Sequence, residues 1–399
     1  MRRFSSEKLY IAKRRWKAAG HSILYYIFRI FPVKKNKIVF WTFEGTGGYG
    51  CNPKYIAEAL IKRKENWELV WLLDDLSYKF PKEIEKVKNT LMNRAYHLAT
   101  ARVWIGNSRT QFGTKKRKNQ IYIQTWHGTV CIKPIGKYRG DHLPLIAQIV
   151  SEADSRLIDY VLSGSDWCDI HYPRGLLYSG HIVRTGTPRC DILFKRNEKN
   201  YQKVRKRYHI PNDAKIVLYA PTFRGGGQNK NRVVTMPNQT IQFDTLIKSF
   251  EKRFGGNWYV LLRLHPQLAH IERNTLNLCS RIIDVTVEPD MNEIVVGIDA
   301  FISDYSSAIF EAALLGIPCF IYVDDKEEYI SERGNLFFDF SELPFPVADS
   351  NEKMNKNIIC FDQNEYELKT KQFIEENGIK EDGRASERVV NMIRKLVNK

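Results

Sequence analysis

Two histidines stand where short apolar runs end, a position from which a side chain can reach a substrate. His127 follows the run Ile121–Trp126 and His265 follows Tyr259–Leu264, and a glycine or a proline comes directly after each histidine. An imidazole titrates near neutral pH, so it can take a proton from an attacking hydroxyl or hold charge beside a phosphate. Each position also fits a buried histidine that is hydrogen-bonded within a turn. Neither histidine by itself therefore identifies a catalytic site.

Groups suited to binding phosphate gather between Asp304 and Glu311. An apolar strand is expected to end at Asp304, and Ser306 or Ser307 would cap the helix that follows. The free backbone N–H groups and the dipole of a helix N-terminus attract anions. Glu311 lies one turn further along and could face the same cleft. Capping alone would explain one serine, but it leaves the aspartate unexplained.

Three arginines lie in or directly after expected strands. Arg189 is part of the segment Gly186–Asp191, and Arg224 precedes three glycines. Arg263 alternates with His265 along a strand and would share its face. Guanidinium groups pair well with phosphate oxygens, so all three arginines are candidates for contacts with a diphosphate. A surface ion pair is the alternative for Arg189 and Arg224.

A glycine-rich segment, Glu44–Pro53, follows the first expected strand. It lacks the full GxGxxG order and a Walker lysine, so its phosphate signal is weak. A loop of this composition would also let an acceptor approach the backbone closely, which makes Gly45, Gly48 and Asn52 candidates for the acceptor side. The sequence shows neither a nucleophilic triad nor a cluster with metal-ligand spacing, so no metal site is expected.

The elements that must position these groups alternate between apolar strands and helices. The alternation starts at Lys37, stops in the polar and basic stretch 196–214, and restarts at Ile216. Apolar strands separated by helices predict mainly parallel sheets with both faces covered. Open α/β sheets bind ligands at the carboxyl ends of their strands, so a cleft between two such domains is expected. The predicted units are a basic amphipathic docking segment at 1–36, a first α/β domain at 37–205, and a second α/β domain with C-terminal helices at 206–399.

Positive charge is concentrated at the N-terminus. The chain of 399 residues has a formal net charge of +17, and residues 1–37 hold eleven Lys and Arg against one acid, Glu7. The apolar run His21–Phe31 is far shorter than the ~20 residues that span a bilayer. Basic groups mixed with aromatic residues favour a helix that lies on an anionic membrane surface, although a helix packed on the first domain is the alternative. Seven scattered cysteines without a CxxC pair indicate reduced thiols.

Taken together, five ordered segments resemble the CDP-glycerol glycerophosphotransferases of teichoic acid synthesis. Each motif alone is weak, but five in this order and at this spacing are specific. The resemblance covers about residues 38–347, and after Trp-His-Gly-Thr the usual Pro-Leu-Lys-Lys-like sequence is replaced by Val-Cys-Ile-Lys, which keeps Lys133. The five segments are Trp126–Thr129, Gly186–Asp191, Tyr219–Arg224, Arg263–Pro266 and Asp304–Ser307.

The resemblance implies a GT-B fold, in which two Rossmann-like domains face one cleft, and peripheral attachment to the cytoplasmic face of the cell membrane. It implies transfer of a polyol phosphate from CDP-glycerol or CDP-ribitol to a lipid-linked, polyprenyl diphosphate glycan acceptor, with release of CMP. His127 and His265 would be the catalytic pair, and Lys133 would lie on the acceptor side. Residues implied on the donor side are Arg189, Arg224, Arg263, Asp304, Ser306, Ser307 and Glu311, with the two acids orienting the site or touching the ribose.

Two alternatives stay open at the level of sequence. A GT-B glycosyltransferase that uses a nucleotide sugar would have the same fold and similar phosphate-binding groups. A noncatalytic basic protein that binds lipid or nucleic acid is an alternative of another class. The concentration of charge at the N-terminus and the lack of a nucleic-acid module argue against nucleic acid as a partner. The residues do not distinguish glycerol from ribitol or another polyol.

Overall fold

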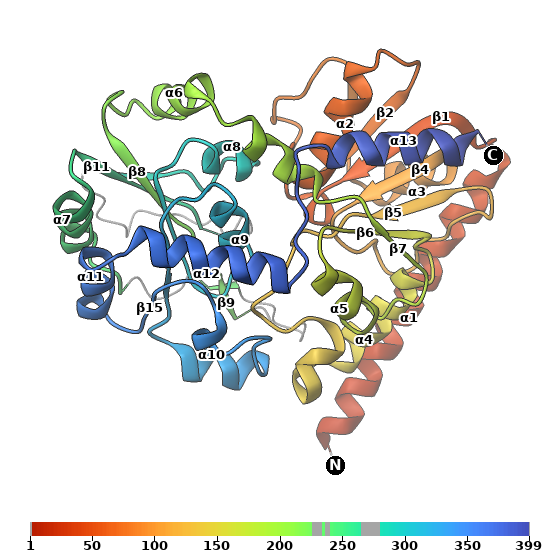
Figure 1. The fold of residues 1–399 in the computed structure, drawn as a ribbon. Coiled ribbons are helices and arrows are strands. Elements are labelled where there is room, and N and C mark those ends of the chain that lie inside the picture. The colour runs from red at the N-terminus through yellow and green to blue at the C-terminus, as the bar shows by residue number, and fades with distance from the viewer. Residues whose placement is uncertain (1, 226–233, 236–239, 265–279, 399) are drawn as a thin grey trace.

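The computed structural model describes residues 2–225, 234–235, 240–264 and 280–398, which fold into two α/β domains side by side (Figure 1). Each domain is built on a sheet of parallel strands with helices packed against it. The strand β2 (Glu68–Leu73) is buried at every position after the first, as a strand between two helical layers requires. The expected fold class, a GT-B-like pair of α/β domains, is confirmed.

The first domain contains a seven-stranded sheet in the order β3-β2-β1-β4-β5-β6-β7. All neighbouring strands in it are parallel, so their carboxyl ends meet at one edge. The remaining strands are β1 (Lys34–Trp41), β3 (Ile84–Lys88), β4 (Ala101–Gly106), β5 (Ile121–Gln124), β6 (Tyr160–Ser163) and β7 (His181–Arg184). The helices are α2 (Cys51–Lys62), α3 (Leu91–Thr100), α4 (Leu145–Ser155) and α5 (Asp166–Leu176), with 3-10 turns η2 (Phe43–Gly45), η3 (Gly136–His142) and η4 (Pro188–Lys195).

The second domain contains a six-stranded parallel sheet in the order β12-β11-β8-β13-β14-β15, and a separate antiparallel pair, β9 and β10. Its central strands end at the segments that the sequence marked for phosphate binding. The strands are β8 (Lys215–Tyr219), β9 (Arg224–Gly225), β10 (Val234–Thr235), β11 (Trp258–Leu262), β12 (Ile282–Asp284), β13 (Ala300–Ser303), β14 (Cys319–Tyr322) and β15 (Val347–Ala348). The helices are α6 (Glu198–Arg207), α7 (Phe243–Phe254), α8 (Asn292–Val295), α9 (Ala308–Ala313), α10 (Lys326–Arg333), α11 (Asn351–Ile359) and α12 (Gln363–Glu376), with the 3-10 turn η6 (Phe340–Glu342).

The last helix, α13 (Ala385–Val397), returns to the first domain and lies beside α2 (Figure 1). Val389, Val390 and Ile393 are fully buried there in a cluster with side chains of the first sheet. The carboxylate of Asp191 accepts hydrogen bonds from the first two backbone N–H groups of the helix, at 2.9 and 2.8 Å. Helix α13 therefore packs on the first domain, although it follows the second domain along the chain.

The N-terminal helix α1 (Arg2–Ile27) packs one face against the first domain. Ile11, Ala18 and Tyr25, spaced by seven residues, are buried on that face, and seven residues are close to two helical turns. The Tyr25 hydroxyl lies 3.2 Å from Thr114 Oγ1, and Ser22 Oγ donates a 2.8 Å hydrogen bond to the backbone next to it. Among the described residues, no helix has the length and apolarity needed to cross a membrane.

A buried ion pair ties the two domains together. Lys54 on α2 lies 2.8 Å from a carboxylate oxygen of Asp290 and 2.8 Å from one of Glu293, both in the second domain. The side chains of Lys54 and Asp290 are 4% and 3% exposed, so their charges are almost entirely removed from water. Removing one partner of such a pair leaves an uncompensated buried charge, which costs more than the pair itself contributes.

We therefore expect Lys54→Met to lower the free energy of unfolding by about 3–5 kcal/mol in urea denaturation. The matched control is Lys353→Met, which removes an exposed partner of Asp349 on the surface and should change stability by less than about 0.5 kcal/mol. Equal losses for the two variants would contradict the assignment of Lys54 to a buried, domain-bridging pair.

Candidate functional site

His127 follows strand β5 after Thr125 and Trp126, at the carboxyl edge of the first sheet. The preceding Trp126 has a φ of 49°, a left-handed conformation that a bulky residue rarely adopts and that turns the chain away from the strand. The imidazole Nδ1 donates a 2.8 Å hydrogen bond to the Asn107 carbonyl, which leaves Nε2 as the basic nitrogen. The rings of Trp126 and Phe43 pack against the imidazole, with centroids 4.4 and 5.4 Å away.

The surroundings of His127 keep its ring neutral. Burial lowers the pKa of His127 to about 3, and the charges of Arg189 and Lys133 act in the same direction, whereas the hydrogen bond to Asn107 opposes them. A neutral imidazole has a lone pair at Nε2 that can accept a proton or a hydrogen bond, whereas burial disfavours a cationic ring here.

The turn after His127 touches the second domain. A Cβ placed on Gly128 would lie 3.0 Å from Ser307 Oγ, so the backbone there passes directly over this serine. Ser307 precedes α9, and Ser306 Oγ accepts a 3.3 Å hydrogen bond from the Ala308 N–H. The structure thus brings the backbone that follows His127 against Ser307, which the sequence placed at a strand end in the other domain.

Arg189 and Glu311 pair with each other across the domain boundary. Arg189 Nε donates to Glu311 Oε1 at 3.0 Å, and its Nη2 donates to the His127 carbonyl at 2.8 Å. Asn292 donates to Glu311 Oε2 at 3.0 Å, and Asn52 Oδ1 accepts from the Arg189 N–H at 3.0 Å. Glu311 is buried, and the guanidinium of Arg189 balances its carboxylate charge inside the protein. Arg189 and Asn52 thus belong to one network with the His127 turn. The acceptor-side role of Asn52 stays a prediction.

Arg224 and Asp304 form a second network at the carboxyl ends of β8 and β13. Arg224 Nη1 donates to Asp304 Oδ2 at 3.0 Å, and Nη2 donates to Asp325 Oδ1 at 3.2 Å. Asp304 also accepts the Thr222 N–H at 2.9 Å and the Thr222 hydroxyl at 2.6 Å. The network borders a cavity of about 1280 Å³, whose wall includes Arg224, Asp304 and Tyr329. The cavity is large enough for a nucleotide-sized ligand.

Arg263 is buried and turned toward the protein. Its Nη1 donates to the carbonyls of Val285 and Glu288, at 3.2 and 2.6 Å. The guanidinium therefore fixes the loop between β12 and α8. His265, two residues further on, lies outside the described residues, so its predicted place in the site stays a prediction.

The predicted acceptor-side residues have different surroundings, and their shared role stays a prediction. Gly48 packs against the second domain, since a Cβ there would lie 3.0 Å from Pro289 Cβ. Gly45 has a φ of +109° and lies against Asn89, so a side chain would be excluded. Lys133 is half-buried and makes no hydrogen bond or ion pair with any described residue. Burial lowers the pKa of Lys133, and the charge of Asp304 opposes this effect.

Sequence reasoning missed Asn107, whose carbonyl orients His127. Asn107 is fully buried and directly follows β4. Its Oδ1 accepts the Phe43 N–H at 2.8 Å, so it joins two strand ends. The sequence signal that could have identified Asn107 is its position, an asparagine at the carboxyl end of a strand that neighbours β5. In the part of the chain that the structure describes, no group of three His, Cys, Asp or Glu could hold a metal ion.

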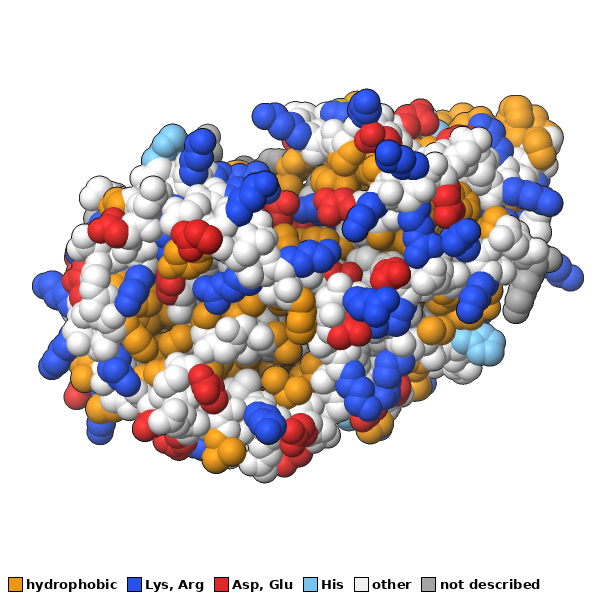
Figure 2. Space-filling model, turned by 45° about the horizontal axis from the view of Figure 1, so that its top comes forward, with side chains coloured by type: hydrophobic (Ala, Val, Ile, Leu, Met, Phe, Trp, Pro, Cys, Tyr) orange, Lys and Arg blue, Asp and Glu red, His pale blue; other side chains and the backbone are white. Residues whose placement is uncertain are grey.

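The space-filling view shows a surface hollowed between the two halves of the molecule and bordered by Lys and Arg side chains (Figure 2). A profile of the CDP-Glycerol:Poly(glycerophosphate) glycerophosphotransferase family matches residues 23–395. The chain is 28% identical over 394 residues to the teichoic acid glycerol-phosphate transferase of Staphylococcus aureus, covering 94% of this chain and 98% of that protein.

Larger relatives match over part of their length. The poly(glycerol phosphate) polymerase of Bacillus subtilis is 27% identical, covering 91% of this chain and 49% of the polymerase. The poly(ribitol-phosphate) polymerase of Bacillus spizizenii is 30% identical, covering 92% and 58%. The chain thus spans about half the length of these polymerases. A structure of the wall teichoic acid polymerase TagF soaked with CDPG superposes with a TM-score of 0.81 at 25% identity, covering 100% of this chain and 98% of that one.

The state of His127 can be measured directly. Since burial lowers the pKa of this histidine to about 3, its ring should stay neutral from pH 8 to pH 5, where an ordinary histidine takes up a proton. Selective ¹⁵N-histidine labelling reports the charge of each ring by NMR, and the spectrum of His127→Asn identifies the resonance. A titration of that resonance near pH 6.5 would show that the ring is not held neutral.

Proposed function

Because the chain belongs to the CDP-Glycerol:Poly(glycerophosphate) glycerophosphotransferase family, we propose that it transfers glycerol phosphate, or a related polyol phosphate, from a CDP-polyol to a lipid-linked glycan acceptor. The observation that carries this proposal is the contact between the two domains at Gly128 and Ser307. It sets a neutral histidine of one domain beside the serine turn of the other. Cell-surface polymer synthesis of the teichoic acid type is the proposed context.

In the proposed reaction, a hydroxyl of the acceptor attacks the β-phosphorus of the CDP-polyol. A P–O bond forms between the acceptor and the β-phosphorus as the bond from the β-phosphorus to the bridging oxygen breaks, and CMP leaves with that oxygen. His127 Nε2 accepts the proton of the attacking hydroxyl, since Nδ1 is held by the Asn107 carbonyl. Such a transfer depends on positioning and on neutralising phosphate charge more than on covalent catalysis.

We assign the donor to the second domain. Ser306, Ser307 and His265 would contact the donor phosphates, and the cavity beside Arg224 would accommodate the nucleoside end. Arg189, Arg263 and Glu311 are proposed as positioning residues, because their polar groups already meet protein partners. Lys133 is proposed to approach the phosphates from the first domain.

A donor panel tests the reaction. Purified protein is incubated with CDP-glycerol, CDP-ribitol and nucleotide sugars in the presence of a lipid-linked acceptor, and nucleotide release is measured. CMP release from a CDP-polyol is expected. Turnover of a nucleotide sugar, with none of the CDP-polyols, would instead assign the chain as a glycosyltransferase.

The histidine roles are tested by His127→Ala and His265→Ala. General acid–base groups contribute roughly 10²–10⁴-fold to rate, so His127→Ala should lower kcat by about that factor. His181→Ala is the matched control, because His181 is exposed on β7 and should keep wild-type turnover. Near-normal turnover of His127→Ala would remove His127 from the role of base.

We also propose that α1 and the 3-10 turn η1 (Phe28–Ile30) dock on an anionic membrane surface. Leu9, Trp16, Ile23 and Ile30 are spaced by seven residues and are 58%, 80%, 58% and 77% exposed. They lie about opposite to the buried stripe that begins at Ile11, since an offset of two residues is roughly 200° around a helix. An exposed apolar stripe on a basic helix is typical of interfacial attachment.

Sedimentation with phosphatidylglycerol vesicles tests this surface. The double variant Trp16→Ala/Ile30→Ala removes two exposed apolar groups and should weaken vesicle binding at least ten-fold. Leu368→Ala is the control, because Leu368 is 69% exposed on α12, away from the stripe. Equal vesicle binding by the double variant and the control would contradict docking through α1.

A further inference from the structure

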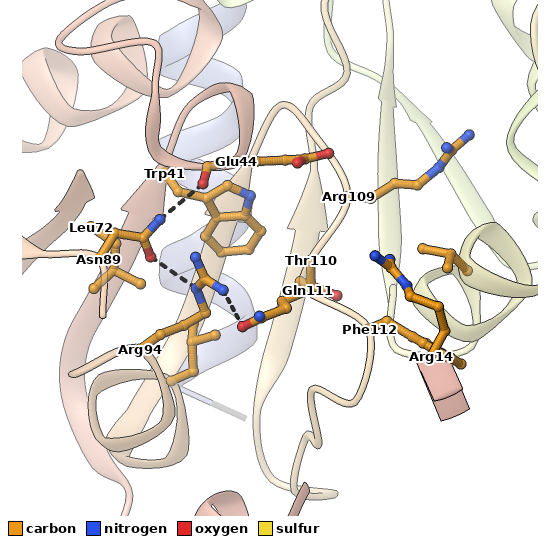
Figure 3. A pocket seen from close by; sticks show the side chains of 12 residues that line it. Arg14, Trp41, Glu44, Leu72, Asn89, Arg94, Arg109, Thr110, Gln111 and Phe112 are labelled. Carbon is orange, nitrogen blue, oxygen red and sulfur yellow. Dashed lines mark hydrogen bonds between the residues drawn. The ribbon is translucent and has the colours of Figure 1, made fainter. Parts of the chain in front are cut away.

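A second cavity lies in the first domain, apart from the wide cavity beside Arg224. Its volume is about 310 Å³, and it is enclosed by α1, α3, the η2 turn and the loop that follows β4 (Figure 3). Trp41, Leu72 and Leu98 give it a buried apolar side. None of the roles assigned to the donor or to His127 uses this cavity.

Arginines from three separate elements line the cavity. Arg14 comes from α1, Arg94 from α3 and Arg109 from the loop after β4 (Figure 3). Within the described residues that line it, Glu44 supplies the one carboxylate. Three positive charges against one negative charge favour an anionic ligand.

Ion pairs do not neutralise the three arginines that line the cavity. Arg94 Nε donates to Asn89 Oδ1 at 2.8 Å, and its Nη1 donates to Gln111 Oε1, but both acceptors are neutral amides. Arg14 and Arg109 make no hydrogen bond or ion pair with any residue that the structure describes. Arg109 is nevertheless half-buried, and burial lowers the pKa of its guanidinium more than the charges of Asp154 and Glu44 raise it. An anionic ligand would offset this cost of burial.

The cavity shares two loops with the His127 site. Phe43 packs on the His127 ring, and the next residue, Glu44, lines the cavity. Likewise, Asn107 holds the His127 imidazole, and the same loop continues to Arg109. The Glu44 N–H donates to Ser108 Oγ at 2.7 Å, which joins the two loops. A ligand in the cavity would therefore lie next to the proposed base.

The cavity also borders the proposed membrane helix. Arg14 is exposed on α1, the element that carries the apolar stripe, and the rest of the lining belongs to the body of the first domain. A group that is attached to a lipid could enter from the membrane side while its polar end reached the loops around His127.

We propose, on the basis of the transfer to a lipid-linked acceptor proposed above, that this cavity binds a lipid-attached phosphate, namely the diphosphate that joins the acceptor to its lipid. Arg14 and Arg109 contact phosphate oxygens, and Arg94 adds charge from α3. The site fixes the acceptor so that its free hydroxyl, further from the lipid, is directed toward His127.

The test is direct binding of farnesyl diphosphate, measured by isothermal titration calorimetry. Arg14→Gln and Arg109→Gln should each weaken binding at least ten-fold. Arg15→Gln is the matched control, because Arg15 is an exposed neighbour on α1 that does not line the cavity, and it should stay within two-fold of wild type. Thermal melting shows whether each variant is folded. If Arg109→Gln is unfolded, the comparison of Arg14→Gln with Arg15→Gln still tests the site, because Arg14 is exposed and its replacement should not affect folding.

Two results would overturn the proposal. Equal weakening by Arg14→Gln and Arg15→Gln would show that only the overall charge of α1 matters. Selective loss of phosphatidylglycerol vesicle binding by Arg14→Gln, with farnesyl diphosphate binding unchanged, would assign the cavity to a phospholipid headgroup. The proposed transfer is measured separately, as CMP release from wild-type protein. CMP release without farnesyl diphosphate binding would contradict the cavity site and leave the proposed transfer intact.

Discussion

The buried pairing of Arg189 with Glu311 is the constraint on which the cleft depends. Glu311 is 1% exposed, so separating the domains at this point would leave a carboxylate without its partner inside the protein. The same guanidinium holds the His127 carbonyl, and the Arg189 backbone is held by Asn52 and Asn292. One ion pair therefore fixes the first domain's histidine turn against the second domain's serine turn. The Lys54 pair reinforces this spacing from α2.

The sequence predicted where the site would form better than it predicted what each side chain does there. Parallel strands end at one edge, so residues such as His127 and Ser307 could be placed at a cleft from local patterns alone. The partner of an arginine is a long-range property. Arg263 alternates with His265 along the chain, yet its guanidinium binds carbonyls of a loop more than twenty residues away. Local sequence does not distinguish such an anchor from a phosphate ligand.

The helices at the two chain ends show the same division between local and distant information. The seven-residue spacing of apolar groups in α1 makes an amphipathic helix predictable. One stripe of it is buried on the first domain, and docking of the opposite, exposed stripe on a membrane stays a prediction. The apolar face of α13 was equally readable. The domain on which α13 packs could not be predicted in this way, because it depends on Asp191 and on the surface of α2, which lie far earlier in the chain.

Charge balance in the cleft bears on how a donor would be held. Arg224 already faces two carboxylates, Asp304 and Asp325, so a diphosphate would gain little further attraction from it. Lys133 has no such ion pair among the described residues, and it comes from the first domain. In the proposed reaction, Lys133 would therefore bring positive charge to the donor from the opposite domain. Donor affinity in the proposed reaction should then depend on the same domain spacing that Arg189 and Glu311 maintain, which couples donor binding to the position of His127.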